Sequence, residues 1–222
     1  MKKLRIAILI VLLVLILDQV FKIWIKTHML LGEEYSVLGN WFYIHFTENN
    51  GMAFGLEFAG KFGKMLLSLL RIFAVIGIGW YIYILCKKNE HIGLIVSSAL
   101  ILAGACGNII DSAFYGLIFN ESSPICVDCI PSVILPAEGG YSTFLHGKVV
   151  DMLYFPILEG HFPSWFPFWK GESFTFFRPV FNLADSSITI GVLLIILFQK
   201  RFFKKDEKLN EQELKKINEE SF

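Results

Sequence analysis

Three familiar catalytic signatures are missing from this sequence. It contains no G-x-S-x-G nucleophile elbow, no H-E-x-x-H zinc helix and no glycine-rich phosphate-binding loop. Its serines and histidines are not spaced as an obvious nucleophilic set. Carboxylate side chains are therefore the available catalytic groups.

The chain also has no formal net charge and few cysteines. Twenty Lys and Arg balance 20 Asp and Glu, so nothing in the charge argues for a nucleic-acid partner. Four cysteines are present, and Cys126 and Cys129 form a lone C-x-x-C. Because no second ligand pair accompanies it, we predict no metal site, and nothing in the sequence indicates a cofactor.

Apolar side chains are abundant by contrast. The chain is 55% hydrophobic and contains 22 Phe, which is more than a soluble domain of 222 residues usually carries. Four segments reach the roughly 20 residues that cross a bilayer, at about 6–25, 65–86, 92–119 and 180–199. The first lacks an A-x-A-like cleavage site and is followed by DQVFK, so we interpret it as an uncleaved span and not a signal peptide. The predicted fold is a mainly α membrane protein with four transmembrane helices.

Basic residues predict the orientation of these spans. They cluster before the first span, between the second and third, and after the fourth: Lys2, Lys3, Arg5, Lys87, Lys88, Lys200, Arg201, Lys204 and Lys205. The positive-inside rule places these clusters, and so both termini, in the cytoplasm. Residues 1–205 are then a single integral-membrane domain and 206–222 a charged cytoplasmic tail. Two long segments, about 28–64 and 117–179, face outward.

The outward segments are aromatic. WFYIHFTENNGMAFGLEF at 41–58 alternates and is broken by a turn at Asn49-Asn50-Gly51, which predicts a small β-rich segment lying on the membrane. FPSWFPFWKGESFTFF at 162–177 carries two tryptophans, which concentrate at bilayer interfaces. It either anchors the protein or contacts a lipid-bearing substrate. In an oxidising exterior Cys126 and Cys129 are either disulfide-bonded or free thiols.

Polar side chains converge on the outward ends of the spans. They are Asp18, Gln19, Lys22, Asn108, Asp111, Asp151, Asn182 and Asp185. Charges at membrane depth are costly and usually functional. Individually, each residue suits a helix cap or a tie between helices; together they indicate a polar site. Arg71, in the second span, is either a partner of this set or a snorkelling side chain.

Two aspartates in a poorly hydrated site cannot both ionise cheaply. One keeps a proton while the other is charged. The ionised carboxylate can activate water, and the protonated one can polarise a carbonyl and later protonate the leaving nitrogen, as in aspartic peptidases. The residues alone leave open which two aspartates form such a pair.

Five motifs, in order along most of the chain, resemble those of the lipoprotein signal peptidase family, also called signal peptidase II. They are DQVFK (18–22), NNGMAFG (49–55), GACGNIID (104–111), GKVVDM (147–152) and FNLADSSITIG (181–191). The resemblance implies an aspartic endopeptidase that removes the signal peptide of diacylglyceryl-modified prolipoproteins, cleaving before the lipidated cysteine. It implies a bacterial inner-membrane protein with its active site toward the outer face, whose partners are the prolipoprotein, membrane lipid and globomycin-type inhibitors.

The resemblance also implies residue roles. Asp151 and Asp185 would be the catalytic pair. The substrate-binding or supporting residues would be Asp18, Lys22, Asn49, Gly51, Asn108, Asp111 and Asn182.

The chain departs from the family pattern at two places. Ser112 stands where the family has arginine after the third motif, and Arg178 is a candidate substitute cation. An insertion at about 119–146 separates the third and fourth motifs and is either a lid or partner surface or, as we favour, a tolerated loop.

Two other classes of function compete with a peptidase. A proton- or ion-coupled transporter would need polar residues through the whole membrane, yet the fourth span is apolar after Thr189. A non-catalytic anchoring protein would tolerate an Asp-to-Asn change.

Overall fold

The structure is a computed structural model that describes residues 2–50, 60–156, 158–161, 173–176 and 179–203. Four long apolar helices, α1 (Lys2–His28), α2 (Gly60–Lys87), α3 (Ile92–Ile110) and α5 (Leu183–Phe202), are the main elements. A π-helical turn, η2 (Asp111–Tyr115), and the short α4 (Gly116–Ile118) continue α3. The predicted mainly helical membrane fold with four spans is confirmed.

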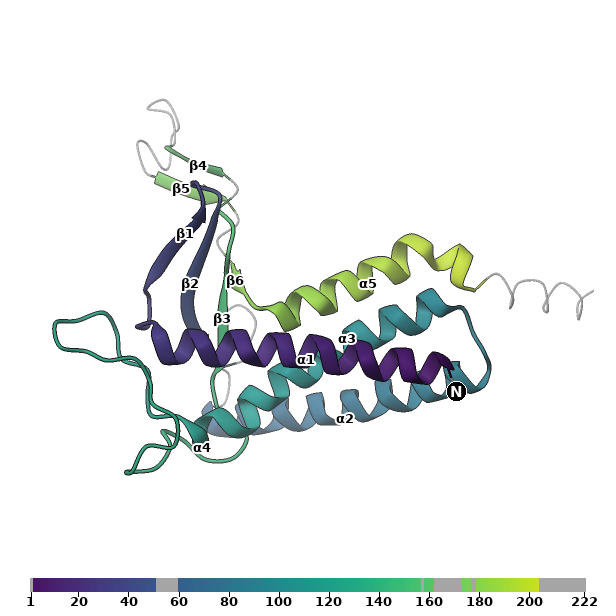
Figure 1. The fold of residues 1–222 in the computed structure, drawn as a ribbon, viewed down its shortest axis with the longest axis horizontal. Helices are drawn as coiled ribbons and strands as arrows, with labels where there is room; N and C mark the ends of the chain where they lie inside the picture. The colour runs from purple at the N-terminus through teal and green to yellow at the C-terminus, as the bar shows by residue number, and fades with distance from the viewer. Residues whose placement is uncertain (1, 51–59, 157, 162–172, 177–178, 204–222) are drawn as a thin grey trace, which may run out of the picture.

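The helices run side by side, and the N-terminus lies at the same end of the bundle as the α2–α3 connection (Figure 1). Lys3 fixes this end by donating to the carbonyls of Asn89 and Glu90 at 3.0 and 2.6 Å. Large apolar side chains such as Phe73 and Leu197, 69% and 72% exposed, cover the outer faces. Such a surface suits lipid and not water.

The fourth helix begins later than the sequence pattern predicts. Val180–Phe181 form a short strand, β6, which pairs with the end of β3 (Val149–Tyr154). The helix then starts at Leu183, and Asn182 is its N-cap. The hydropathy pattern missed this boundary because Val180 and Phe181 are apolar, although they belong to the sheet and not to the membrane-spanning helix.

A small antiparallel sheet stands at the other end of the bundle, its strands running across the helix direction (Figure 1). Its order is β1 (Glu34–Leu38), β2 (Phe42–Asn49), β3 and β6. The expected β-rich segment is therefore confirmed as far as Asn49, while residues 51–58 lie outside the described residues. Of the interfacial aromatic segment, the structure describes β5 (Ser173–Phe176), which pairs with β4 (Leu158–His161).

Among the described residues, two apolar clusters hold the fold together, and α1 contributes to both. Ala7, near its start, packs with residues of α2, α3 and α5. Ile25, in its last turn, and Met29, which follows the helix, pack against residues of β2 and β3. Asp18 and Lys22 lie on α1 between these two clusters. The predicted polar layer is therefore enclosed by apolar packing on both sides.

The insertion at 119–146 has no helix or extended strand and is fixed at its base. The ammonium group of Lys26 pairs with Glu48 of β2 and donates to the Ser122 hydroxyl at 2.7 Å. The Ser122 hydroxyl in turn lies 2.9 Å from that of Ser132. These buried contacts connect the insertion to α1 and to the strand that carries Asn49.

Candidate active site

Asp151 lies in the middle of β3, opposite Thr47 of β2. Only 3% of the residue is exposed. One carboxylate oxygen accepts a hydrogen bond of 2.7 Å from the Asn182 amide, and the other accepts one from the Asn49 amide. Burial, assisted by the nearby charge of Asp185, raises the pKa of Asp151 to about 7. Asp151 is therefore suited to hold a proton near neutral pH.

Asp185 lies in the first turn of α5, where Asn182 and Asp185 form a capping box. The Asp185 N–H donates to the Asn182 side-chain oxygen at 2.9 Å, and the Asn182 N–H donates to the Asp185 carboxylate at 3.4 Å. The Asn108 amide donates to the other Asp185 oxygen at 2.8 Å. The positive end of the helix dipole also favours an ionised group at this position.

Asn182 connects the two carboxylates. Its side-chain amide donates to Asp151, and its side-chain oxygen caps the turn that carries Asp185. The residue is fully buried. Its orientation is thus fixed, and Asp151 and Asp185 are held on either side of one amide.

Lys22 is the centre of a second, fully buried group. Its ammonium lies 2.9 Å from Asp18, 2.8 Å from Asp111 and 3.0 Å from the Asn108 side-chain oxygen. Three donors thus meet three acceptors, which is the condition under which a buried charge is tolerated. The group ties α1 to α3.

Asp18 and Asp111 each accept a further hydrogen bond from a backbone N–H that neighbours Asp185 or Asp151 in the chain. Asp18 accepts from the Ala184 N–H at 2.9 Å, at the start of α5. Asp111 accepts from the Val150 N–H at 3.3 Å, next to Asp151 on β3. Both carboxylates therefore act as ties and caps that hold the elements carrying Asp185 and Asp151.

Gln19 and Tyr115 extend this network. The Gln19 amide donates to Asp111 at 2.9 Å and its oxygen accepts from the Tyr115 hydroxyl at 3.1 Å. Gln19 belongs to the predicted polar layer. Nothing in the sequence singles out Tyr115, because its role depends on the π-helical turn that follows Asp111.

Ser112 does not supply a charge to the site. Its hydroxyl donates to the Asn108 carbonyl, one turn earlier, at 3.0 Å. Gly51 and Arg178, which the sequence also suggests for the site, lie outside the described residues. Within the described part of the chain, no group of three or more His, Cys, Asp or Glu is arranged to hold a metal ion.

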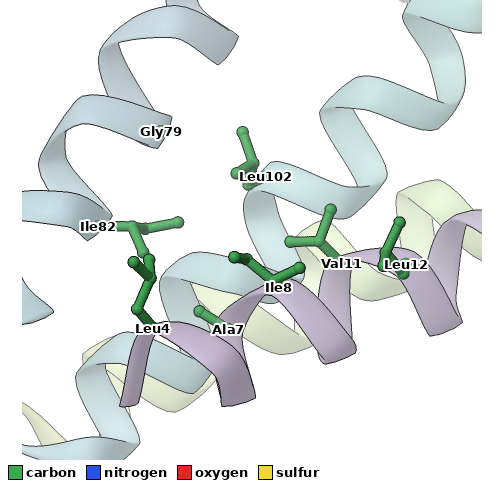
Figure 2. Close-up of a pocket in the computed structure, with 8 residues that line it drawn as sticks. All are labelled: Leu4, Ala7, Ile8, Val11, Leu12, Gly79, Ile82 and Leu102. Atoms are coloured by element: carbon green, nitrogen blue, oxygen red, sulfur yellow. The ribbon is translucent and has the colours of Figure 1, made fainter. Parts of the chain in front are cut away.

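An apolar cavity of about 200 Å³ lies elsewhere, among α1, α2 and α3 (Figure 2). Its lining residues are Leu4, Ala7, Ile8, Val11, Leu12, Gly79, Ile82 and Leu102. They offer no acid, base or nucleophile, so the cavity is not a candidate for chemistry.

Four long apolar helices with buried carboxylates and amides clustered at one end are the features of a multi-pass membrane protein with a polar site. The family model for signal peptidase (SPase) II matches residues 10–201. The lipoprotein signal peptidase of Porphyromonas gingivalis is 51% identical over 195 residues, covering 86% of this chain and 81% of the relative. That of Amoebophilus asiaticus is 40% identical over 191 residues, covering 85% and 75%. The chain therefore belongs to the signal peptidase II family and is a protease.

Two solved bacterial membrane enzymes share the fold. One, solved by the in meso method at 2.3 Å, has a TM-score of 0.56 and 27% identity and covers 88% of each chain. The other, at 1.9 Å, has a TM-score of 0.55 and 30% identity, covering 86% of this chain and 90% of that one. These likenesses support a multi-pass bacterial membrane protein and give no support to the transporter alternative.

Proposed function

We propose that this protein removes the signal peptide from diacylglyceryl-modified prolipoproteins, cutting before the lipidated cysteine, as an aspartic endopeptidase. Family membership and the names of the relatives support the substrate class. One observation carries the catalytic type: the Asn182 side chain donates to Asp151 and caps the turn that bears Asp185, so one buried amide holds the two carboxylates together. Burial and the charge of Asp185 raise the pKa of Asp151 to about 7, which agrees with this assignment. A pair that shares one proton is the requirement for aspartic peptidase chemistry.

The two carboxylates start in different states. In the proposed reaction the buried Asp151 starts with the proton. Asp185, which accepts hydrogen bonds from Asn108 and from the Asn182 N–H at a helix N-terminus, starts as the carboxylate. A water molecule gives a proton to Asp185 as its oxygen attacks the scissile carbonyl carbon. Asp151 at the same time gives its proton to the carbonyl oxygen, forming a neutral tetrahedral diol.

Collapse of the diol restores the enzyme. Asp185 passes the proton it took from water to the peptide nitrogen, and the carbon–nitrogen bond breaks. Asp151 recovers a proton from a diol hydroxyl as the new carboxylic acid forms. Asn49, Asn108 and Asn182 keep the two carboxylates in place by donating to them throughout.

The membrane location proposed for this reaction follows from the positions of the basic residues. The basic clusters support the proposed orientation, in which both termini are cytoplasmic and the carboxylate pair lies near the outer face of the inner membrane. A substrate that combines a membrane helix with a lipidated cysteine would reach the pair from the bilayer. Globomycin-type compounds would compete for the same place.

The test is cleavage of a synthetic diacylated prolipoprotein by the purified full chain in detergent and in bilayers. Asp151→Asn and Asp185→Asn should each lose at least about 100-fold in kcat, because each removes one of the acid and base groups. Asp128→Asn is the matched control, since Asp128 is exposed on the insertion. Retained cleavage in either site variant would exclude the pair, and intact substrate with the unaltered protein would exclude the activity.

A further inference from the structure

The insertion at 119–146 lies beyond the ends of α1 and α4, at the end of the bundle that carries the sheet (Figure 1). It encloses an ion pair whose members lie outside it, Lys26 of α1 and Glu48 of β2. Their side chains are 0% and 2% exposed. A buried ion pair is tolerated where further hydrogen bonds satisfy its remaining groups. The insertion supplies such contacts.

Ser122 is the central contact between the insertion and this pair. Its hydroxyl donates to the Glu48 carboxylate at 2.8 Å and accepts from the Lys26 ammonium at 2.7 Å. The Ser132 hydroxyl lies 2.9 Å from that of Ser122, and the centre of the Tyr141 ring lies 5.2 Å from the Lys26 ammonium. The insertion therefore fixes the Glu48 carboxylate through a connected set of buried polar contacts.

Glu48 directly precedes Asn49, whose side-chain amide donates to Asp151. Successive side chains of a strand point to opposite faces, so Glu48 faces α1 and the insertion while Asn49 shares the face of Asp151. The register agrees, because Glu48 pairs with Val150 and Asn49 with Val149, diagonal to Asp151. Asn49 is also the last residue of β2. The contacts of Glu48 therefore fix the strand where the Asn49 side chain leaves it.

The start of β3 is joined to the same carboxylate by Lys148. The Lys148 ammonium lies 3.7 Å from the second Glu48 oxygen and 3.1 Å from Glu121 of the insertion. Glu121 is exposed, so its ion pair with Lys148 contributes little. The buried contact through Ser122 is therefore the stronger of the two links from the insertion to Glu48.

We propose that the insertion is a positioning element of the candidate site, which through Ser122 and Glu48 holds the Asn49 amide in place to donate to Asp151. This inference rests on the proposed function, in which Asp151 gives its proton to the scissile carbonyl. A small displacement of a group at the reacting centre lowers the rate steeply, so a contact outside that centre can affect kcat. Hydrogen bonds to a charged group, such as that from Ser122 to Glu48, are also among the stronger ones.

The test is a double-mutant cycle in kcat, measured with the full chain and the synthetic diacylated prolipoprotein. Asn49→Ala removes the hydrogen bond to Asp151, and Ser122→Ala removes the contact that holds Glu48. Each should lower kcat by roughly 10-fold with little change in KM. The double variant should have about the kcat of Asn49→Ala alone, because both changes act on the same donor. Ser36→Ala, at an exposed position of β1, is the matched control and should leave kcat unchanged.

The dependence of kcat/KM on pH gives an independent measurement. Burial raises the pKa of Asp151, and the Asn49 hydrogen bond lowers it in part because it favours the ionised carboxylate. Loss of this hydrogen bond raises the pKa further. The alkaline limb should therefore move to higher pH in Asn49→Ala and also in Ser122→Ala. A general loss of stability would not move this limb.

The possible outcomes are distinguishable. Independent losses that multiply in the double variant would overturn the role of the insertion and leave the peptidase intact. So would an alkaline limb that stays in place in a folded Ser122→Ala variant. If thermal unfolding shows that this variant does not fold, Ser132→Ala replaces it and should give the same pattern with a smaller loss, judged by the same two outcomes. An unaltered protein that cleaves nothing would instead refute the proposed function.

Discussion

Asp18 on α1 accepts a hydrogen bond of 2.9 Å from the backbone N–H of Ala184, which lies 166 residues later at the start of α5. The same carboxylate pairs with Lys22 at 2.9 Å. The buried Asp18 side chain therefore satisfies an N–H at the start of α5 and fixes the position of the helix turn that carries Asp185. The geometry of the candidate pair depends on α1, although α1 contributes neither member.

Removing the charge of Asp18 should be strongly destabilising. Asp18→Asn leaves Lys22 with one carboxylate in a buried site, and breaking such a pair costs about 3–5 kcal/mol. We expect a lower unfolding temperature in detergent. Glu34→Gln is the control, because Glu34 pairs with His45 at an exposed position, where ion pairs contribute little. Equal unfolding temperatures for the two variants would contradict the role of Asp18.

The close approach of α3 and α5 should depend on Gly104. A Cβ atom placed there would lie 2.2 Å from the Ala184 carbonyl oxygen and 2.7 Å from Ile188. Gly104→Ala should therefore push the helices apart and lower the free energy of unfolding by about 1–3 kcal/mol. Gly77→Ala, where nothing lies within 4 Å, should be neutral or slightly stabilising. An unfolding midpoint for Gly104→Ala that matches Gly77→Ala would refute this packing.

Activity should fall at alkaline pH. The proposed reaction needs a protonated Asp151, whose pKa is raised to about 7 by burial and by Asp185. The alkaline limb of kcat/KM against pH should therefore lie near pH 7. A limb governed by a lysine or tyrosine, about three units higher, would show that Asp151 does not supply the acid.

Stability should also depend on Asp151. Its folded pKa of about 7 lies above the roughly 3.9 of an unfolded aspartate, so the folded state binds the proton more tightly. The contribution of this group is complete below about pH 4 and is lost as the pH rises through about 7. Asp151→Asn removes the titrating group. Between about pH 4 and pH 7, the unfolding temperature of this variant should therefore fall less than that of the unaltered protein. Parallel curves for the two proteins would contradict the raised pKa.

The cysteines of the insertion should be oxidised in exported protein. The sulfur atoms of Cys126 and Cys129 are bonded in the structure. The contacts among Lys26, Glu48 and Ser122 that fix the base of the insertion involve neither cysteine. Mass spectrometry without reductant should find the two cysteines linked. The Cys126→Ser/Cys129→Ser variant should cleave substrate normally. Alkylation of both thiols in exported protein would rule out the disulfide.

Some features of the fold could be predicted because their causes are local. A span is recognised from the summed hydropathy of about 20 consecutive residues, and the N-x-x-D spacing of Asn182 and Asp185 is that of a capping box. The identical spacing of Asn108 and Asp111 has a different outcome. There α3 passes into a π-helical turn, and the two side chains face Asp185 and Lys22 respectively. Sequence spacing cannot distinguish these cases, because they depend on what packs against each helix.

Hydropathy and the positions of charged residues are properties of the chain alone, so they were sufficient to predict a membrane protein of four spans with a polar layer near one boundary. It left Asp18, Asp111, Asp151 and Asp185 equivalent as bare residues, and only the motif resemblance favoured one pair. The tertiary structure separated them. Lys22 lies between Asp18 and Asp111, whereas Asn182 lies between Asp151 and Asp185. The surroundings of a carboxylate depend on distances through space between elements far apart in sequence, so only the fold shows which two aspartates contact Lys22 and which two are joined by the Asn182 side chain.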